Sequence, residues 1–159
     1  MIVMGVDPST KSGVVRIDGD ETYATVINNT NAKGIRRVQW IADQFEDYLD
    51  RLNPMPDVAV IEGYAYANKF TLATLVEIGI ILRLSLHNRK IPCYICPPSV
   101  LKKFCTGKGN SKKPELAIAV KQRWGYENPS DDIIDAFILA KIAQELASGK
   151  SVVGLELLL

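Results

Sequence analysis

The sequence is poor in cysteine and has no excess of charge of either sign. Three cysteines, an odd number, are too few for a disulfide scaffold, so a reducing, cytoplasmic setting is expected. Nineteen Lys and Arg residues face eighteen Asp and Glu residues, for a net charge of +1. Net charge therefore predicts no particular partner, and any argument for nucleic acid must rest on the local distribution of charge.

Long apolar runs are also absent. Glu77 and Arg83 interrupt the longest candidate, so no membrane-spanning helix and no membrane partner are expected. Asp7 interrupts the first strand-like run before the core of a signal peptide forms, which argues against secretion. The hydrophobic fraction of 47% and the charged fraction of 23% are those of a globular protein and argue against extended disorder.

Zinc ligands are too sparse to predict a zinc site. Cys93 and Cys96 have the spacing of half a site, but Cys105 and His87 do not form a second pair. In a strand, residues three apart point to opposite faces, so Cys93 and Cys96 are not expected to share a metal.

The periodicity of apolar residues predicts a single α/β domain over residues 1–159. Three strands open the chain and strands and helices then alternate, which predicts a mixed central β-sheet flanked by α-helices. The helix over 70–86 is apolar on almost every side and is expected in the core or against a partner subunit. The tail 150–159 fits a docked terminus or a subunit contact. The predicted strands are 2–6, 13–17, 22–27, 57–61 and 91–96, and the predicted helices are 33–52, 70–86, 99–105 (capped by Ser99), 114–124 and 130–146.

Four acidic residues stand out by their place in this pattern. Asp7 and Glu62 lie at the carboxyl ends of the first and fourth predicted strands, and they meet if those strands are neighbours. Asp132 and Asp135 lie three residues apart near the start of the last helix, on one of its faces. Clustered carboxylates repel one another and need a cation. Oxygen ligands suit Mg²⁺, and two such ions can activate a water and stabilise the leaving oxygen of a phosphodiester.

Each acidic residue taken singly also fits a structural role, because acids often end strands and are favoured in a first helical turn. Asp131, three residues after Asn128, is assigned to such a capping role. Asp135 is harder to explain in this way. It lies among apolar residues, where a carboxylate lowers stability unless it is paired or bound to a metal.

Positive charge is concentrated between Ser99 and Trp124, against a single acid, Glu115. The segment surrounds a loop with Gly107 and Gly109, where the backbone is free to approach a phosphate. We favour contact with DNA phosphates over the alternative of a solvated lysine-rich face. The basic residues are Lys102, Lys103, Lys108, Lys112, Lys113, Lys121 and Arg123.

Aromatic residues follow Glu62 closely. Tyr64 and Tyr66 are candidates for stacking on unpaired bases at a branch point of DNA. Core packing is the alternative explanation, and it is the preferred one for Phe70.

Four short motifs, in this order and spacing, resemble those of the RuvC family of Holliday-junction resolvases, within the RNase H-like superfamily. No motif alone is decisive, but the four together cover residues 5 to about 140, and the order of predicted elements matches the RNase H-like fold. The motifs are Gly5-Val6-Asp7-Pro8-Ser9, Val60-Ile61-Glu62-Gly63, Gly107-Lys108-Gly109 with Lys113 four residues on, and Asp132-Ile133-Ile134-Asp135-Ala136.

The resemblance implies a homodimeric, metal-dependent endonuclease of DNA recombination and repair that cuts Holliday junctions and other branched DNA, leaving a 5′-phosphate and a 3′-hydroxyl. It places the protein in the cytoplasm, or in the host cytoplasm if it is phage-encoded. Two Mg²⁺ ions per site are implied, with Mn²⁺ as a substitute. Asp7, Glu62, Asp132 and Asp135 fall on the family's catalytic, metal-binding carboxylates, and Lys113 falls on its active-site lysine.

The chain also departs from the family pattern. Many bacterial members have Gly where Ser9 stands, and the next glycine, Gly13, comes one residue early. Ala65, between Tyr64 and Tyr66, stands where the family often has an aromatic residue at the junction centre. These differences suggest a divergent member, closer to the phage type than to the standard bacterial type, and leave strict junction selectivity open.

Three other functions were weighed against a resolvase. A related nuclease of looser specificity, which would cut flaps, forks or RNA–DNA hybrids, is separated from it only by a comparison of substrates. A catalytically inactive junction-binding protein has no need of four carboxylates. An actin-like or sugar-kinase ATPase shares the early Asp and glycine turn, but it needs a second phosphate loop and a far longer chain.

Overall fold

A mixed sheet of six strands, in the order β3-β2-β1-β4-β5-β6, organises the computed structural model, which describes residues 1–64 and 69–158. β1, β2 and β3 form an antiparallel meander, whereas β4 and β5 run parallel to β1 and β6 returns antiparallel to β5. The three predicted opening strands and the predicted mixed sheet are therefore confirmed. The strands are β1 (Ile2–Asp7), β2 (Lys11–Asp18), β3 (Glu21–Asn28), β4 (Val58–Glu62), β5 (Cys93–Cys96) and β6 (Glu156–Leu158).

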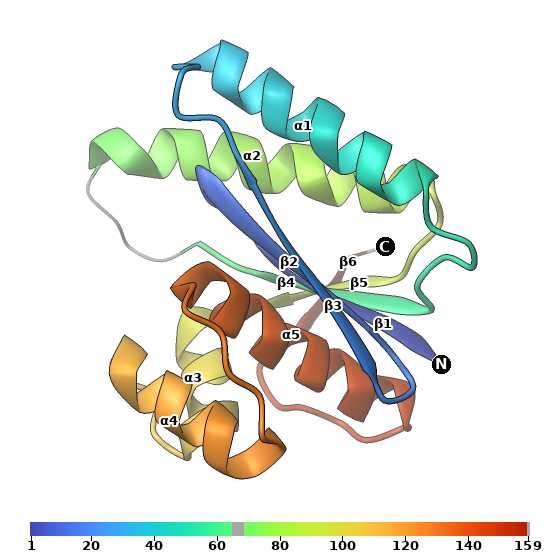
Figure 1. Ribbon diagram of the computed structural model, residues 1–159, viewed down its shortest axis with the longest axis vertical. Helices are drawn as coiled ribbons and strands as arrows, with labels where there is room; N and C mark the ends of the chain where they lie inside the picture. Colours follow the sequence, from blue (N-terminus) through green and yellow to red (C-terminus); the bar gives the residue numbers. More distant parts are fainter. Residues whose placement is uncertain (65–68, 159) are drawn as a thin grey trace.

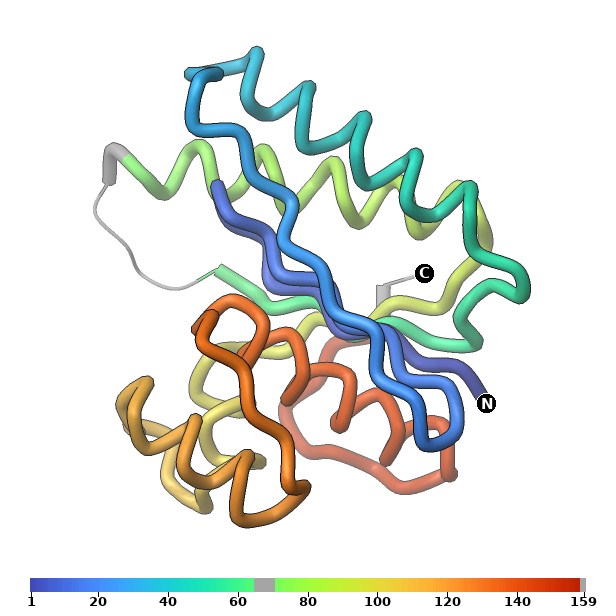
Figure 2. The backbone as a smooth tube through the Cα atoms, in the orientation of Figure 1, coloured from blue at the N-terminus to red at the C-terminus, as the bar shows by residue number. Residues whose placement is uncertain are grey.

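Helices cover both faces of the sheet (Figure 1). α1 and α2 lie together on one face, and α3, α4 and α5 lie on the other. The backbone trace shows α5 running along the sheet, opposite the α1–α2 layer (Figure 2). The helices are α1 (Ile35–Asp50), α2 (Lys69–Asn88), α3 (Pro98–Thr106), α4 (Lys113–Trp124) and α5 (Asp131–Ala147).

The central strands are apolar throughout because each contributes to two cores. Successive side chains of a strand point to opposite faces. Val3 and Val60 therefore pack with α5, whereas Met4 and Ile61 pack with α1 and α2. Every residue of β1 is buried, including Asp7 at its end.

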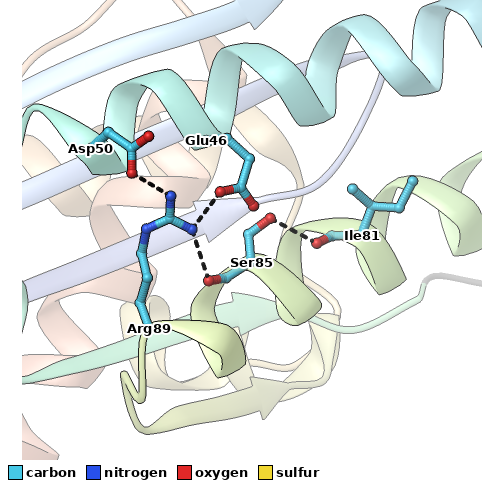
Figure 3. A network of polar contacts seen from close by, with 5 residues as sticks. All are labelled: Glu46, Asp50, Ile81, Ser85 and Arg89. Carbon is cyan, nitrogen blue, oxygen red and sulfur yellow. Dashed lines mark hydrogen bonds and ion pairs between the residues drawn. The ribbon is translucent and has the colours of Figure 1, made fainter.

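An ion-pair network joins α1 and α2 at their carboxyl-terminal ends (Figure 3). The guanidinium of Arg89 lies 2.5 Å from carboxylate oxygens of both Glu46 and Asp50 on α1. It also donates to the carbonyl of Ser85, one turn earlier in α2, at 3.3 Å. One guanidinium thus pairs with two carboxylates at this end of the helix pair.

The structure corrects the expected cap of α3 and shows how the tail and α2 lie. The apolar tail is docked by its own backbone, because β6 pairs with β5. Ser99 does not cap α3: Pro97 is the N-cap and Pro98 opens the helix, a position where proline's missing N–H is tolerated. α2 buries only one side within this chain, and Ile80 and Leu84 remain 49% and 53% exposed.

Among the described residues, the helices are too short or too polar to cross a bilayer.

Candidate active site and metal centre

Two carboxylates come together through the pairing of β1 with β4. These strands run parallel, with Val6 opposite Ile61. The next residues along the two strands are Asp7 and Glu62, so both side chains lie at the same carboxyl-terminal edge of the sheet. The sequence predicted that Asp7 and Glu62 meet if their strands are neighbours, and the structure shows that the strands are neighbours.

A third carboxylate, Asp135, is delivered by α5, which lies unusually close to the sheet. A Cβ atom on Gly5 of β1 would fall 2.0 Å from the carbonyl oxygen of Ala136. A Cβ atom on Gly13 of β2 would fall 2.2 Å from the carbonyl oxygen of Asp132. Only glycine permits these backbone contacts, and they hold the first turns of α5 against the strand ends.

The carboxylates of Asp7, Glu62 and Asp135 form one compact group. One oxygen atom from each lies within 4.8 Å of the other two. Asp132 is outside this group of three but lines the same cleft, as do Lys102 and Lys113. The structure thus gathers the four predicted carboxylates and the predicted active-site lysine from four separate elements, β1, β4, α4 and α5.

Burial and mutual repulsion make these carboxyl groups hard to ionise. The pKa of Asp7, which is 8% exposed, lies well above its ordinary value through burial, and the charges of Glu62 and Asp135 raise it further. Burial raises the pKa of Glu62 to about 7, and Asp135 adds to this. Burial likewise raises the pKa of Asp135 to about 6, while the ammonium of Lys113 opposes the shift.

This donor set fits Mg²⁺ and no soft metal. All of its donors are carboxylate oxygens, and a hard divalent cation would offset the repulsion that raises their pKa values. Cys93 and Cys96 are free thiols that lie in the cores on opposite faces of the sheet. Within the described ranges, 1–64 and 69–158, the three-carboxylate group is the one cluster of acidic, His or Cys side chains close enough to hold an ion.

The basic residues of the predicted segment have three different roles. Lys102 and Lys113 line the cleft, whereas Lys103, Lys108 and Lys112 are exposed on α3 and on the loop that joins it to α4. Lys121 instead forms an ion pair with Glu127 at 2.7 Å. Arg123 donates to the carbonyls of Phe104 and Cys105 and lies over the Trp124 ring, so it joins α3 to α4. The lysines of α3, α4 and the loop between them therefore remain the candidates for phosphate contact.

The glycines of the α3–α4 loop have a structural use. Gly107 ends α3 in the left-handed region, at φ 83°. Gly109 packs on the backbone of Ser99, where a Cβ atom would lie 3.3 Å from the carbonyl oxygen. The hydroxyls of Thr106 and Ser111 lie 2.6 Å apart and tie the ends of the loop together. The glycines thus shape a fixed loop that carries Lys108.

The assignment of Asp131 to capping with Asn128 is wrong. Asn128 accepts from the backbone N–H of Ser130 at 2.9 Å, which makes Ser130 the N-cap of α5. The Ser130 hydroxyl accepts from the N–H of Ile133 at 3.4 Å. Asp131 faces α4, and its carboxylate lies 3.7 Å from the ammonium of Lys113.

Tyr64 lies flat on α2. Its ring covers Gly79, where a Cβ atom would be 3.1 Å from the ring edge, and its hydroxyl accepts from Arg83 at 2.6 Å. The side chain is still 39% exposed, but these contacts hold it beside the cleft. Tyr66, the other candidate for base stacking, lies outside the described residues.

Gly5 and Gly13 are positioning residues that sequence reasoning did not assign. Gly5 lies between apolar residues of β1, and Gly13 directly precedes Val14 and Val15 in β2. A lone glycine inside such a strand is a sign of close backbone approach, so the signal was present in the sequence. What the sequence does not tell is that the approaching backbone belongs to the helix that carries Asp132 and Asp135.

The family model for crossover junction endodeoxyribonuclease RuvC matches residues 3–142. The chain belongs to the RuvC family. Among curated relatives, RuvC of Frankia alni is 29% identical over 150 residues, which cover 88% of this chain and 76% of the relative. RuvC of Thermotoga maritima is 26% identical over 148 residues, which cover 87% of each chain.

Two solved structures of Thermus thermophilus RuvC are similar to this chain. One has a TM-score of 0.73 at 21% identity and covers 94% of this chain and 98% of its own. The other, T. thermophilus RuvC in complex with a Holliday junction substrate, has a TM-score of 0.73 at 20% identity and covers 92% and 94%. This likeness shows the fold, and the predicted RNase H-like α/β architecture is confirmed.

Proposed function

We propose that this RuvC-family protein is a metal-dependent endonuclease that cuts four-way DNA junctions in recombination and repair. The reaction is hydrolysis of a backbone phosphodiester, with a 5′-phosphate and a 3′-hydroxyl as products. The observation that carries the proposal is the meeting of Asp7, Glu62 and Asp135 within 4.8 Å at the base of a cleft rimmed by lysines.

Asp7, Glu62, Asp132 and Asp135 would hold two Mg²⁺ ions, with Mn²⁺ as a substitute. Such ions, when bound, lower the pKa of a water and stabilise charge on the attacking and leaving oxygens. The chain contributes the carboxylates that fix the ions beside the strand ends. Asp7 is buried and the other three are partly buried, and all four are held by β1, β4 and α5. Little reorganisation is therefore needed when substrate arrives.

Lys113 is proposed as a catalytic residue. It lines the cleft, and its charge acts on both Glu62 and Asp135. A lysine beside the scissile phosphate stabilises negative charge that develops during hydrolysis. Lys102, Lys103, Lys108 and Lys112 would contact neighbouring phosphates, which gives affinity without reading the sequence.

A homodimer is proposed because a junction needs two strands cut and each subunit supplies one site. The exposed side of α2 supports this, since Ile80 and Leu84 lie one turn apart and about half of each is open to solvent. Light scattering after gel filtration tests it with Leu84→Glu, which should give monomers. Ile118→Glu is the matched control, because Ile118 is 57% exposed on α4 and should leave the dimer intact.

We also propose that one nuclease domain spans residues 1–159, because β6 ties the tail into the sheet. A cytoplasmic site of action is proposed from the three cysteines, which are all free and buried.

The deciding experiment is a cleavage assay on a synthetic four-way junction, a flap, a fork and a linear duplex. Each substrate is incubated with Mg²⁺, with EDTA and with the Asp7→Asn variant. Paired nicks confined to the junction, dependent on metal and on Asp7, are the expected result. Cutting of every branched substrate would replace junction resolution by a general branched-DNA nuclease. Tight junction binding without any cutting would overturn the proposed catalysis.

A further inference from the structure

A second groove lies beside the catalytic cleft. It has a volume of about 460 Å³ and is formed by the turn after β1, the segment before α1 and the first turns of α2. Leu75 lines both hollows, so the groove adjoins the catalytic cleft. Its other contributors include the basic residues Lys33 and Arg37 and the hydroxyl-bearing Thr10, Thr71 and Thr74.

The charge of this groove is of one sign. Lys33 and Arg37 line it, and no acid does so among the residues that the structure describes. Nε of Arg37 donates to the carbonyl of Ala32 at 2.7 Å, which fixes the guanidinium at the groove. Ammonium, guanidinium and hydroxyl groups are the side chains that contact phosphate oxygens in protein–DNA complexes.

The charge order along α1 is the reverse of what helix stability favours. The positive end of a helix prefers Asp or Glu, but the first turn of α1 has none and carries Arg36 and Arg37. The acids of α1, such as Asp43 and Glu46, lie further along the helix. This order disfavours the isolated helix and is offset when an anion occupies the adjacent groove.

We propose that this groove binds the phosphate backbone of the substrate DNA on the side of the scissile phosphate away from the α3–α4 lysines. The proposal rests on the proposed nuclease function. α1 and α2 lie on one face of the sheet and α3 and α4 on the other, with the carboxylates at the strand ends between them (Figure 1). Lys33 and Arg37 would therefore contact the DNA strand on one side of the carboxylates, and Lys102 and Lys113 would contact it on the other side.

Two positive flanks solve an electrostatic problem of this site. A cluster of carboxylates repels the phosphates that it must cut, and repulsion is strongest before metal ions are bound. Positive charge on both sides of the carboxylates holds the DNA strand across them. Positive charge on one side alone would fix the DNA strand at one point only. The near-neutral net charge of the chain conceals this arrangement.

The test is the salt dependence of junction binding by the Lys33→Gln/Arg37→Gln variant of the full chain. Binding of a four-way junction is measured in EDTA across a range of salt concentrations. Each lost phosphate contact reduces the magnitude of the slope of log affinity against log salt by about 0.9 on duplex DNA. Two contacts are lost in each subunit, so a reduction of about 1.8 per subunit, or about 3.6 for the proposed dimer, is expected. At low salt, Kd should rise about tenfold or more, and the enzyme concentration for half-maximal single-turnover cleavage should rise with it.

The matched control is Arg51→Gln/Lys90→Gln, which removes the same charge near the opposite ends of α1 and α2. Arg51 and Lys90 are exposed and line neither hollow. Binding by this control should stay within about twofold of the wild type, because exposed charges more than a Debye length away are largely screened. Arg37→Lys should retain most of the affinity, since it keeps the charge while losing the hydrogen bond to Ala32.

An unchanged slope in the double variant, or an equal loss in the control, would overturn the groove proposal. So would a loss in Arg37→Lys as large as in the double variant, because loop structure and not charge would then be responsible. These results are distinct from a failure of the nuclease function. If the wild type neither binds nor cuts the junction, both proposals fall, whereas a wild type that does both while the double variant matches it leaves the nuclease function standing.

Discussion

The two faces of the sheet are packed in different ways. On the α5 face, backbone meets backbone at Gly5 and Gly13. On the α1–α2 face, large side chains such as Phe45 and Leu82 are completely buried and keep the helices at a distance. A helix that brings a carboxylate to the strand ends must lie close to the sheet. A helix that only covers a core can lie further away, with large side chains filling the space between helix and sheet.

The same contrast holds for charge. At the far end of α1 and α2, Arg89 is matched by Glu46 and Asp50. At the strand ends, burial raises the pKa values of Asp7, Glu62 and Asp135, and the charges of neighbouring carboxylates raise them further. A cluster of carboxylates whose pKa values are strongly raised is typical of a functional site, here one that binds a cation.

The largest effect is expected from Asp7→Asn, which removes the most buried carboxylate of the α5 face. Cleavage should fall about a thousandfold or more, because metal-ion catalysis supplies several kcal/mol of transition-state stabilisation. Junction binding should survive, since the lysines around the cleft are unchanged. In EDTA the variant should also melt at a higher temperature than the wild type, because a repelling carboxylate is gone. Cleavage at the wild-type rate would remove Asp7 from the metal site.

Gly5→Ala and Leu82→Ala test the packing contrast directly. An added Cβ at Gly5 meets the backbone of α5 at 2.0 Å, so the helix must shift and take Asp135 with it. A displacement of about 1 Å is expected to lower cleavage about a hundredfold. Leu82→Ala should lower the free energy of unfolding by about 2–5 kcal/mol while cleavage by the folded protein stays within a few fold. Chemical denaturation and single-turnover assays measure both, and similar activity losses would contradict the contrast.

Lys113→Ala should slow cleavage by about a hundredfold, as expected when one group that stabilises developing charge is removed. Binding should weaken much less, because other lysines line the rim. Lys121→Ala is the matched control: Lys121 lies on the same helix but pairs with Glu127 away from the carboxylates. Equal losses in rate and binding for Lys113→Ala would make it an ordinary phosphate contact.

The pH dependence of stability should show the repulsion among the carboxylates. A carboxyl group whose pKa is raised by folding contributes stability below its unfolded pKa and loses it as pH rises through the folded value. Since Glu62 titrates at about 7 and Asp135 at about 6, the protein in EDTA should lose stability as pH rises from about 4.5 to 8. The melting temperature should fall by about 5 °C or more across this window. Mg²⁺ should reduce the fall, and Asp135→Asn should flatten it.

The smallest effect is expected from Tyr64→Ala. The Tyr64 ring lies on Gly79 and its hydroxyl accepts a hydrogen bond from Arg83. Its loss should therefore change the preference for a junction over a linear duplex by less than about threefold, which is less than the loss of one base–aromatic stacking contact would cause. Tyr66→Ala is the comparison, and it should change that preference more if it supplies the stacking. Competition binding with both DNAs measures the ratio. A larger change in Tyr64→Ala than in Tyr66→Ala would reverse this assignment.

Most elements of the fold were predictable because their signals are local. The alternation and length of apolar runs predicted the meander, the parallel strands and α5 to within a few residues. The docking of the tail as β6 was not predictable, because three residues form a strand only when a partner such as β5 is already in place. The capping role of Asp131 was misassigned, because Asn128 accepts from the N–H of Ser130 and the Ser130 hydroxyl caps the helix.

By itself, the sequence determined where each carboxylate stands: Asp7 and Glu62 at strand ends, and Asp135 one turn inside an apolar helix. These positions follow from patterns only a few residues long. Only the tertiary structure decided that the three carboxylates meet within 4.8 Å, and that a basic groove from α1 and α2 opens beside them. The physical reason is that both depend on the register of β1 with β4 and on the contact of Gly5 with α5, which join residues far apart in the chain.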